Sequence, residues 1–253
     1  MGIRRRARYQ SPVIDPRSRP VVVFGDTSEA RTLAASRATG VVRWRDDVAV
    51  GAGPCGAAAR HATLGAALRQ AEAAALVIAL HPFDTAGIAA ARAAAGSAGL
   101  PCLTLLRPPW PRAPGEQRVT VRNAAALARV IPPGARVFAA TGREDLAALR
   151  RLDARLWLRL VAPGARVAGA RIARGAPPFT VDSEMRLFRR IRPDWLVLRN
   201  AGGPGARPKL DAARALGIRV AMIARPPRPC GALATTPEEA CRWIDRITPS
   251  PAG

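Results

Sequence analysis

The sequence has almost no lysine. Of its 40 basic residues all but Lys209 are arginine, and against 18 acidic residues they leave a net charge of +22. Such a charge invites a nucleic-acid interpretation. Aromatic residues make up only 4% of the chain, however, which leaves few platforms for base stacking, and no DNA- or RNA-binding motif occurs. We therefore expect no nucleic-acid partner, since a small polyanionic substrate suits a basic surface equally well.

Metal-binding and redox patterns are also missing. The four cysteines are scattered along the chain: Cys55, Cys102, Cys230 and Cys241. None forms a C-x-x-C pair, and neither His61 nor His81 has a second histidine four residues away. We expect no metal site, and reduced cysteines in a cytoplasmic protein.

Long apolar runs are absent as well. The longest, Ala73 to Leu80, falls far short of the ~20 residues that a membrane span requires. Residues 1–19 are basic but lack the apolar stretch of a secretory signal. We expect a disordered basic tail over 1–19, no membrane association and a monomer.

What the sequence does contain is a regular alternation of short apolar runs and amphipathic segments. Val21 to Phe24, 75–80, 195–198 and 220–223 are apolar runs of strand length, and helical patterns follow them. The alternation predicts an α/β fold in which parallel strands are joined by helical crossovers, as two domains or as one large unit. Because Pro132-Pro133-Gly134 looks like a linker, we expect the domains to cover 20–132 and 133–253.

The first candidate binding loop follows the first predicted strand. It contains Gly25, Thr27, Ser28 and Glu29, and a helix start there would offer backbone N–H groups to an anion. Only one glycine stands where the dinucleotide fingerprint has three. The same residues are also typical helix caps, so a simple capped helix is the alternative.

Two further loops follow predicted strands in the second half. Thr141, Gly142 and Arg143 repeat the earlier spacing of a threonine three residues after a phenylalanine. Asn200 to Gly203 lead from an apolar strand into a helix, and small residues there would let a ligand approach the backbone. A tight turn before a helix would need the same glycines, and both interpretations stay open.

His81 lies just beyond the strand 75–80, where a parallel sheet places its ligands. A histidine bonded to a loop carbonyl is the alternative. Arg43 and Arg45, in the second predicted strand, would suit the 2′-phosphate of NADPH, although two aspartates follow them directly.

Several segments of this chain resemble segments of one known protein family. They are VVVFGDTSEARTLA from Val21, HPF from His81, LRPPW from Leu106, VFAATGR from Val137, ARG-x-x-PFTV from Ala173, LRNAGG from Leu198 and KLDAARALGIRVAMIARPPRP from Lys209. Together they resemble the precorrin-6A reductase family of cobalamin biosynthesis, including its cobalt-precorrin counterpart. The chain departs from the family pattern at Ile78, Leu80 and Arg199.

The resemblance implies two Rossmann-like domains with parallel sheets and an interdomain cleft. It also implies NADPH-dependent reduction of a macrocycle double bond in an anionic tetrapyrrole. We expect hydride transfer without a covalent intermediate, and we identify no catalytic residue that would donate the proton. The expected cofactor-binding residues are Gly25, Thr27, Ser28, Glu29, Thr141, Gly142, Arg143, Asn200, Gly202 and Gly203. The expected substrate-binding residues are His81, Arg174 and Lys209. A catalytically inactive corrinoid- or nucleotide-binding relative is the alternative, and a nucleic-acid-binding protein is a more distant one.

Overall fold

The computed structural model describes residues 19–36, 41–44, 57–161 and 167–248. The chain forms two compact units. Unit 1 holds the residues up to Arg107 together with those from Pro227 onward, and unit 2 runs from Pro108 to Pro226.

Unit 1 is built by alternating strands and helices. Its elements are β1 (Val21–Phe24), α1 (Ser28–Ser36), β2 (Val41–Trp44), α2 (Ala57–Gln70), β3 (Ala75–Ile78), α3 (Thr85–Ser97), β4 (Cys102–Leu105), β11 (Leu233–Ala234) and α7 (Pro237–Ile247). The strand order is β11-β4-β3-β1-β2, and every pair is parallel. Because β2 and β3 flank β1, the chain reverses its direction across the sheet between β1 and β3. Sheets of this kind bind ligands beyond the carboxyl ends of the strands at such a switch point.

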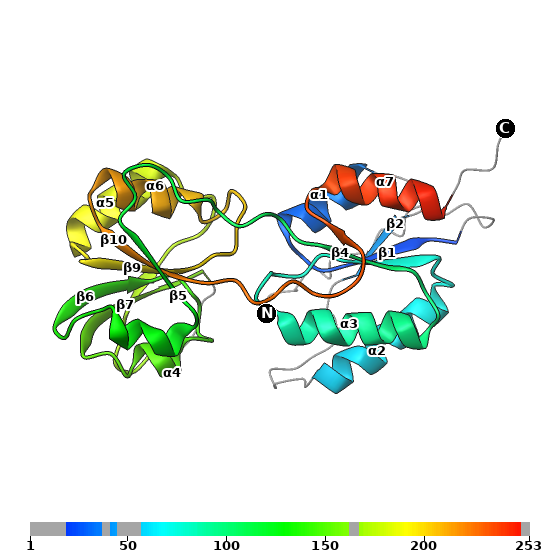
Figure 1. Cartoon of the computed structure of the whole chain (residues 1–253), viewed down its shortest axis with the longest axis horizontal. Helices are drawn as coiled ribbons and strands as arrows, with labels where there is room; N and C mark the ends of the chain where they lie inside the picture. Colours follow the sequence, from blue (N-terminus) through cyan, green and yellow to red (C-terminus); the bar gives the residue numbers. More distant parts are fainter. Residues whose placement is uncertain (1–18, 37–40, 45–56, 162–166, 249–253) are drawn as a thin grey trace, which may run out of the picture. The chain divides into compact units, whose positions relative to one another are not determined.

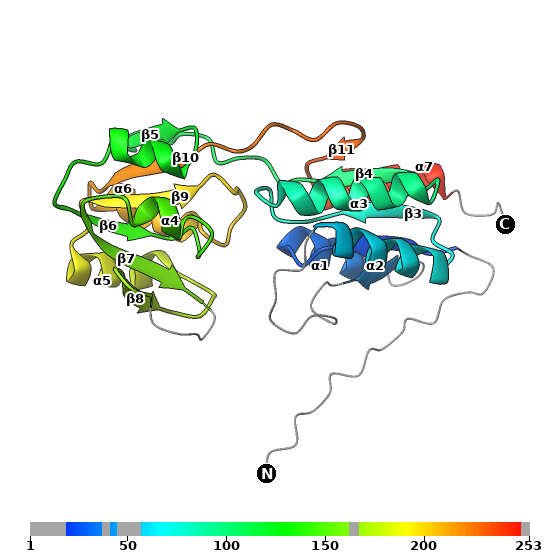
Figure 2. The ribbon, with the colours of Figure 1, turned by 90° about the horizontal axis from the view of Figure 1, so that it is seen from below.

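Helices cover both faces of this sheet, which explains why its central strands β1 and β3 are wholly apolar. Val21 and Val23 pack with α1 and α7, whereas Val22 and Phe24 pack with α2 and α3 on the opposite face. Figure 1 shows α1 and α7 above the sheet and α2 and α3 below it. Seen from below, α2 and α3 lie side by side (Figure 2).

Unit 2 repeats this plan with a larger sheet. Its elements are β5 (Arg118–Val121), the 3-10 helix η2 (Ala124–Arg129), β6 (Ala135–Ala139), α4 (Leu146–Leu149), β7 (Ala154–Leu160), β8 (Arg171–Arg174), α5 (Val181–Ile191), β9 (Trp195–Arg199), α6 (Arg207–Ala215) and β10 (Arg219–Ile223). The strand order is β5-β10-β9-β6-β7-β8, again parallel throughout. From β6 the chain moves outward to β8 and then returns to β9 on the other side of β6. The switch point of unit 2 therefore lies between β6 and β9.

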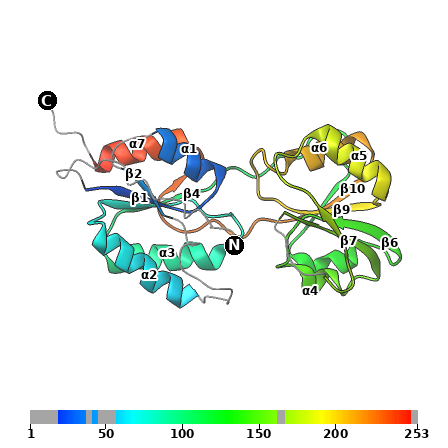
Figure 3. The ribbon, with the colours of Figure 1, turned by 180° about the vertical axis from the view of Figure 1, so that it is seen from behind.

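The core of unit 2 lies between this sheet and the pair α5 and α6, which lie together on one face (Figure 3). Phe138 of β6 meets Phe188 of α5 edge to face, with ring centroids 5.2 Å apart. Thr180 begins α5 with a capping box to Ser183, and acidic residues in the first turn complement the helix dipole. The parallel α/β architecture predicted from the sequence is thus confirmed.

The expected division of the chain at 132/133 needs correction. Strand β5 lies before this point but pairs with β10, since Arg118 stands opposite Val220. Strand β11 and helix α7 lie after it but belong to unit 1. Pro132-Pro133-Gly134 is a turn inside unit 2, where the Gly134 N–H donates to the Asp153 carbonyl at 2.7 Å. Proline and glycine mark a turn, and composition alone does not distinguish a turn from a linker.

Within the ranges given above, no helix is both long and apolar enough to cross a bilayer. In the same ranges, no group of three or more histidine, cysteine, aspartate or glutamate side chains is placed to hold a metal ion.

Candidate functional site at the carboxyl ends of the strands

Gly25 lets the end of β1 press against the end of β3. Its φ is +140°, and a Cβ there would collide with the Ala79 carbonyl group. The Ala79 N–H donates to the Phe24 carbonyl at 2.8 Å. Glycine is therefore required at this position by contact within the protein itself.

The polar side chains after Gly25 are used within unit 1. Thr27 Oγ1 donates to the Ala79 carbonyl at 2.9 Å and accepts from the Ala30 N–H at 3.2 Å, which caps α1. Glu29 Oε2 accepts from Arg107 and from Ser28, both at 3.0 Å. The Glu29 and Arg107 side chains are only 14% and 16% exposed, so this ion pair is partly shielded from water. The capped-helix interpretation thus accounts for these residues, and they also hold the loop rigidly at the switch point.

His81 lies at the same edge of the sheet, three residues beyond β3. It is exposed, and its Nδ1 accepts from the Phe83 N–H at 3.3 Å. The two rings lie 5.9 Å apart. The histidine therefore belongs to the switch-point edge of unit 1, as the sequence predicts.

In unit 2, Thr141 occupies the place that Thr27 occupies in unit 1. It follows β6, whose extension is bonded to β9 by the Ala140 N–H and the Val197 carbonyl at 2.9 Å. Thr141 is 6% exposed, yet within the described part of the chain its hydroxyl has no hydrogen-bond partner. Buried hydroxyls are normally bonded, so this one is suited to a bond with a ligand.

The residues around Thr141 complete a loop with an exposed cation. Gly142 has a φ of +77°, and Arg143 is exposed. The end of β9 is tied to this region because Arg199 donates to Asp145 Oδ2 at 2.8 Å. The loop is therefore held at the switch point by a charged bond from the neighbouring strand.

The glycine loop after β9 accommodates the protein's own chain. Asn200 Oδ1 accepts from the Trp110 N–H at 2.8 Å, and Trp110 Nε1 donates to the Gly203 carbonyl at 2.7 Å. Gly202 has a φ of +69°, and a Cβ there would collide with the Pro108 carbonyl. The close approach that this glycine permits is thus made by Pro108, which supports the tight-turn interpretation for Gly202.

The expected substrate-binding residues of unit 2 differ in their accessibility. Arg174 ends β8 and is exposed. Lys209 is only 3% exposed. Its ammonium lies 3.5 Å from Glu184 Oε1 and 3.8 Å from the centroid of the Phe179 ring. Burial lowers the pKa of Lys209, against the attraction of the Glu184 carboxylate. As placed here, Lys209 does not present its ammonium to solvent.

Sequence reasoning missed the partners of Lys209. Arg159 donates from Nη2 to both carboxylate oxygens of Glu184, at 2.8 and 2.7 Å, and both residues are buried. Arg159 interrupts the apolar strand LWLRL, and an arginine in such a run is a usable signal of a buried ion pair.

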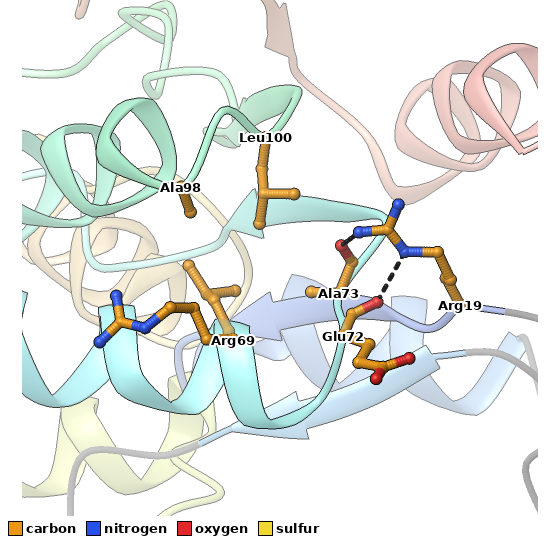
Figure 4. A pocket seen from close by; sticks show the side chains of 7 residues that line it. Arg19, Arg69, Glu72, Ala73, Ala98 and Leu100 are labelled. Carbon is orange, nitrogen blue, oxygen red and sulfur yellow. Dashed lines mark hydrogen bonds between the residues drawn. The ribbon is translucent and has the colours of Figure 1, made fainter.

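Two cavities lie at the amino edges of the sheets, opposite the predicted binding loops. In unit 1, a cavity of about 350 Å³ is lined by residues near the amino ends of β1, β3 and β4. There Arg19 donates to the Glu72 and Ala73 carbonyls, both at 3.0 Å, and so caps the chain after α2 (Figure 4). In unit 2, a cavity of about 680 Å³ is lined by Trp157 and four arginines, Arg136, Arg171, Arg190 and Arg192. Neither cavity is lined by an expected site residue.

Three expectations fall on residues for which the structure gives no side-chain description. They concern the tail 1–18 and Arg45, which lie outside the described residues, and Arg43, which lies in β2 but whose side chain is not described. The preference for a 2′-phosphate therefore stays a prediction.

Comparisons with known proteins agree with this geometry. The family model described as "Precorrin-6x reductase CbiJ/CobK" matches residues 20–245. A precorrin-6A reductase of Rhodococcus erythropolis is 37% identical over 245 residues, which cover 90% of this chain and 98% of the relative. One of Mycobacterium tuberculosis is 41% identical over 184 residues, 70% of this chain and 74% of that one. The solved structure titled "CobK precorrin-6A reductase" matches with a TM-score of 0.80 and 30% identity, and covers 92% of this chain and 99% of that chain.

Proposed function

The chain belongs to the precorrin-6x reductase family CbiJ/CobK, and from this premise we propose that it reduces precorrin-6A, or cobalt-precorrin-6A, with NADPH. A hydride and a proton add across one double bond of the macrocycle, and NADP⁺ and the dihydro product are released. The match over residues 20–245 carries the proposal, because it spans both sheets rather than one nucleotide-binding fold alone.

The residues present at the unit 2 switch point fit an anionic cofactor. Thr141 offers a buried hydroxyl to which no described residue is bonded, and Arg143 supplies an exposed cation two residues later. NADPH supplies the hydride when bound. We assign to Thr141, Gly142 and Arg143 the task of holding its phosphates, through hydrogen bonds and charge at a loop that Arg199 keeps in place.

The unit 1 loop has a different role in this proposal. Because the side chains of Thr27 and Glu29 are bonded within the unit, what the loop offers to a cofactor is backbone N–H groups at the start of α1. Gly25 contributes by keeping the loop against β3.

Charge complementarity supports a polycarboxylate substrate. A corrin precursor carries several acetate and propionate groups, and arginine binds carboxylates through strong, often bidentate bonds. Arg174 and His81 are exposed at the carboxyl edges of their sheets and are assigned to substrate carboxylates. Among the described residues we identify no proton donor.

The test is a direct assay with purified protein. NADPH and precorrin-6A are incubated together, NADPH absorbance is followed, and the product is checked for a mass gain of two hydrogens. The Rhodococcus erythropolis relative serves as the active control. Oxidation of one NADPH per product formed supports the proposal, whereas no oxidation alongside an active control contradicts it.

The same assay tests the alternative that the chain binds its ligands without catalysis. One departure from the family pattern, Ile78, is fully buried in the unit 1 core. If NADPH binds without being oxidised, measured by its fluorescence on titration with protein, the chain is a binding relative that has lost catalysis.

A further inference from the structure

Three buried charged side chains meet beside the sheet of unit 2. Arg159 is the penultimate residue of β7, Glu184 lies in the first turn of α5, and Lys209 lies in the first turn of α6. In a parallel sheet the ends of strands and the starts of the following helices share one edge. The Arg159–Glu184–Lys209 cluster therefore lies at the carboxyl edge, where the expected ligands bind.

The cluster contains one more cation than it has carboxylates. The side chains of Arg159, Glu184 and Lys209 are 8%, 1% and 4% exposed. Both cations share Glu184, and Arg159 Nε has no hydrogen-bond partner in the described part of the chain. A buried cation without its own counter-charge is costly, so an additional anion would complete the cluster.

An aromatic ring now occupies the place beside the two cations. The Phe179 ring centroid lies 3.8 Å from Lys209 Nζ and 4.7 Å from Arg159 Cζ. Phe179 is half-buried, in a loop whose neighbours 176–178 and 180 are exposed. A cation–π contact is weaker than a charge-assisted hydrogen bond to an oxyanion. An oxyanion that reached the cations would therefore bind in preference to the ring.

We propose that Arg159 and Lys209 form a binding site for an oxyanion of the bound ligand, covered by Phe179 in this structure. The inference rests on the proposed function and deepens it, since the oxyanion is a carboxylate of the corrin precursor or a phosphate of NADPH. Glu184 is the positioning residue of this site, because it orients both cations.

The central experiment is the Lys209→Met substitution, with Arg214→Gln as the matched control. Both changes remove one cation from α6, but Arg214 is exposed and lies near the end of the helix. Steady-state kinetics should show a KM at least about tenfold higher in Lys209→Met, the loss of roughly one charge-assisted bond, with kcat little changed. A rise in the KM of precorrin-6A identifies a carboxylate, and a rise in that of NADPH identifies a phosphate. If neither KM rises above that of Arg214→Gln, the proposal is overturned.

A second variant tests whether Arg159 and Lys209 bind the ligand or only hold the loop of Phe179 in place. Phe179→Leu keeps an apolar side chain but removes the ring that faces the cations. If the cations bind the ligand, this change should leave the affected KM the same or lower. If the cations serve only to hold Phe179 in place, Phe179→Leu should raise KM as much as Lys209→Met does, and this result refutes the oxyanion site.

Failure of the reductase proposal would be visible separately. If the wild-type protein oxidises no NADPH with precorrin-6A, the proposed function fails. The cluster is then tested by equilibrium titration of wild type, Lys209→Met and Arg214→Gln with NADPH, followed by fluorescence, and with precorrin-6A, followed by absorbance. Weaker binding of either probe to Lys209→Met alone supports the site, and equal binding by all three proteins contradicts it.

Discussion

Replacing Glu184 by glutamine should be strongly destabilising, although the two side chains have the same shape. The carboxylate accepts two hydrogen bonds from Arg159 Nη2, at 2.8 and 2.7 Å, and lies 3.5 Å from the ammonium of Lys209. Without its charge, two cations remain buried with no anion between them. Breaking a buried ion pair from one side costs about 3–5 kcal/mol. Because the glutamine carbonyl still accepts one bond from Arg159, we expect about 3 kcal/mol for Glu184→Gln.

For Lys209 we expect the opposite effect on stability, because the cluster has one more cation than carboxylates. Lys209→Met removes a desolvated cation and leaves an Arg159–Glu184 pair in balance, so it should cost little or even stabilise. The Glu184→Gln/Lys209→Met double variant should recover about 1 kcal/mol or more relative to Glu184→Gln alone.

Two units can unfold separately, so the measurement must be local. Hydrogen exchange followed by mass spectrometry reports the opening free energy of α5 and β9 in unit 2, and α3 in unit 1 serves as the internal reference. A loss below about 1 kcal/mol in Glu184→Gln, or an equal loss in Lys209→Met, would refute the charge argument.

Three further predictions concern single residues. Gly202→Ala should destabilise unit 2 by about 2 kcal/mol in the same hydrogen-exchange measurement, because of its positive φ and the collision with Pro108. Gly205→Ala, with open space around its Cβ, should be neutral. Thr141→Val should leave stability unchanged or slightly higher, since it removes a buried hydroxyl without a partner, but should raise the Kd for NADPH about five- to tenfold. Burial raises the pKa of Glu116, but hydrogen bonds from Arg118 and a backbone N–H outweigh it and leave the pKa below its usual 4.5. The stabilisation is therefore complete above about pH 4.5 and lost as the pH falls through the lower folded value, so Glu116→Gln should cost more at about pH 7 than at about pH 3.

Apolar runs predicted the central strands because these are buried on both faces. Val21–Phe24 is one case, and Trp195 to Leu198 is another. Strand β11 has only two residues and gave no periodic signal. Without it, nothing in the local pattern showed that α7, an evident amphipathic helix, returns to pack against α1.

Local sequence patterns located the candidate loops but did not show whether each loop contacts a ligand or the protein itself. Glycines and small polar residues mark the ends of parallel strands, and Gly25, Thr141 and Gly202 all lie at switch points. Whether such a glycine faces a ligand or another segment of the protein depends on what packs against it. Pro108, which lies against Gly202, is nearly a hundred residues away in sequence, so local spacing carried no information about the contact.

The spacing of a threonine three residues after a phenylalanine occurs at Phe24 and Thr27 and again at Phe138 and Thr141. The hydrogen bonds of the two threonines differ. Both threonines follow a strand at a switch point. Thr27 donates to Ala79, whereas Thr141 Oγ1 is buried and has no partner among the residues that the structure describes. The second unfulfilled donor in unit 2, Arg159 Nε, lies in a cluster with surplus positive charge. Both of these groups would gain a hydrogen bond from an oxyanion. Their counterparts at the unit 1 switch point, Thr27 and the Glu29–Arg107 pair, are already bonded within the unit. The anionic contacts of the ligands should accordingly depend more on side chains of unit 2 than on those of unit 1.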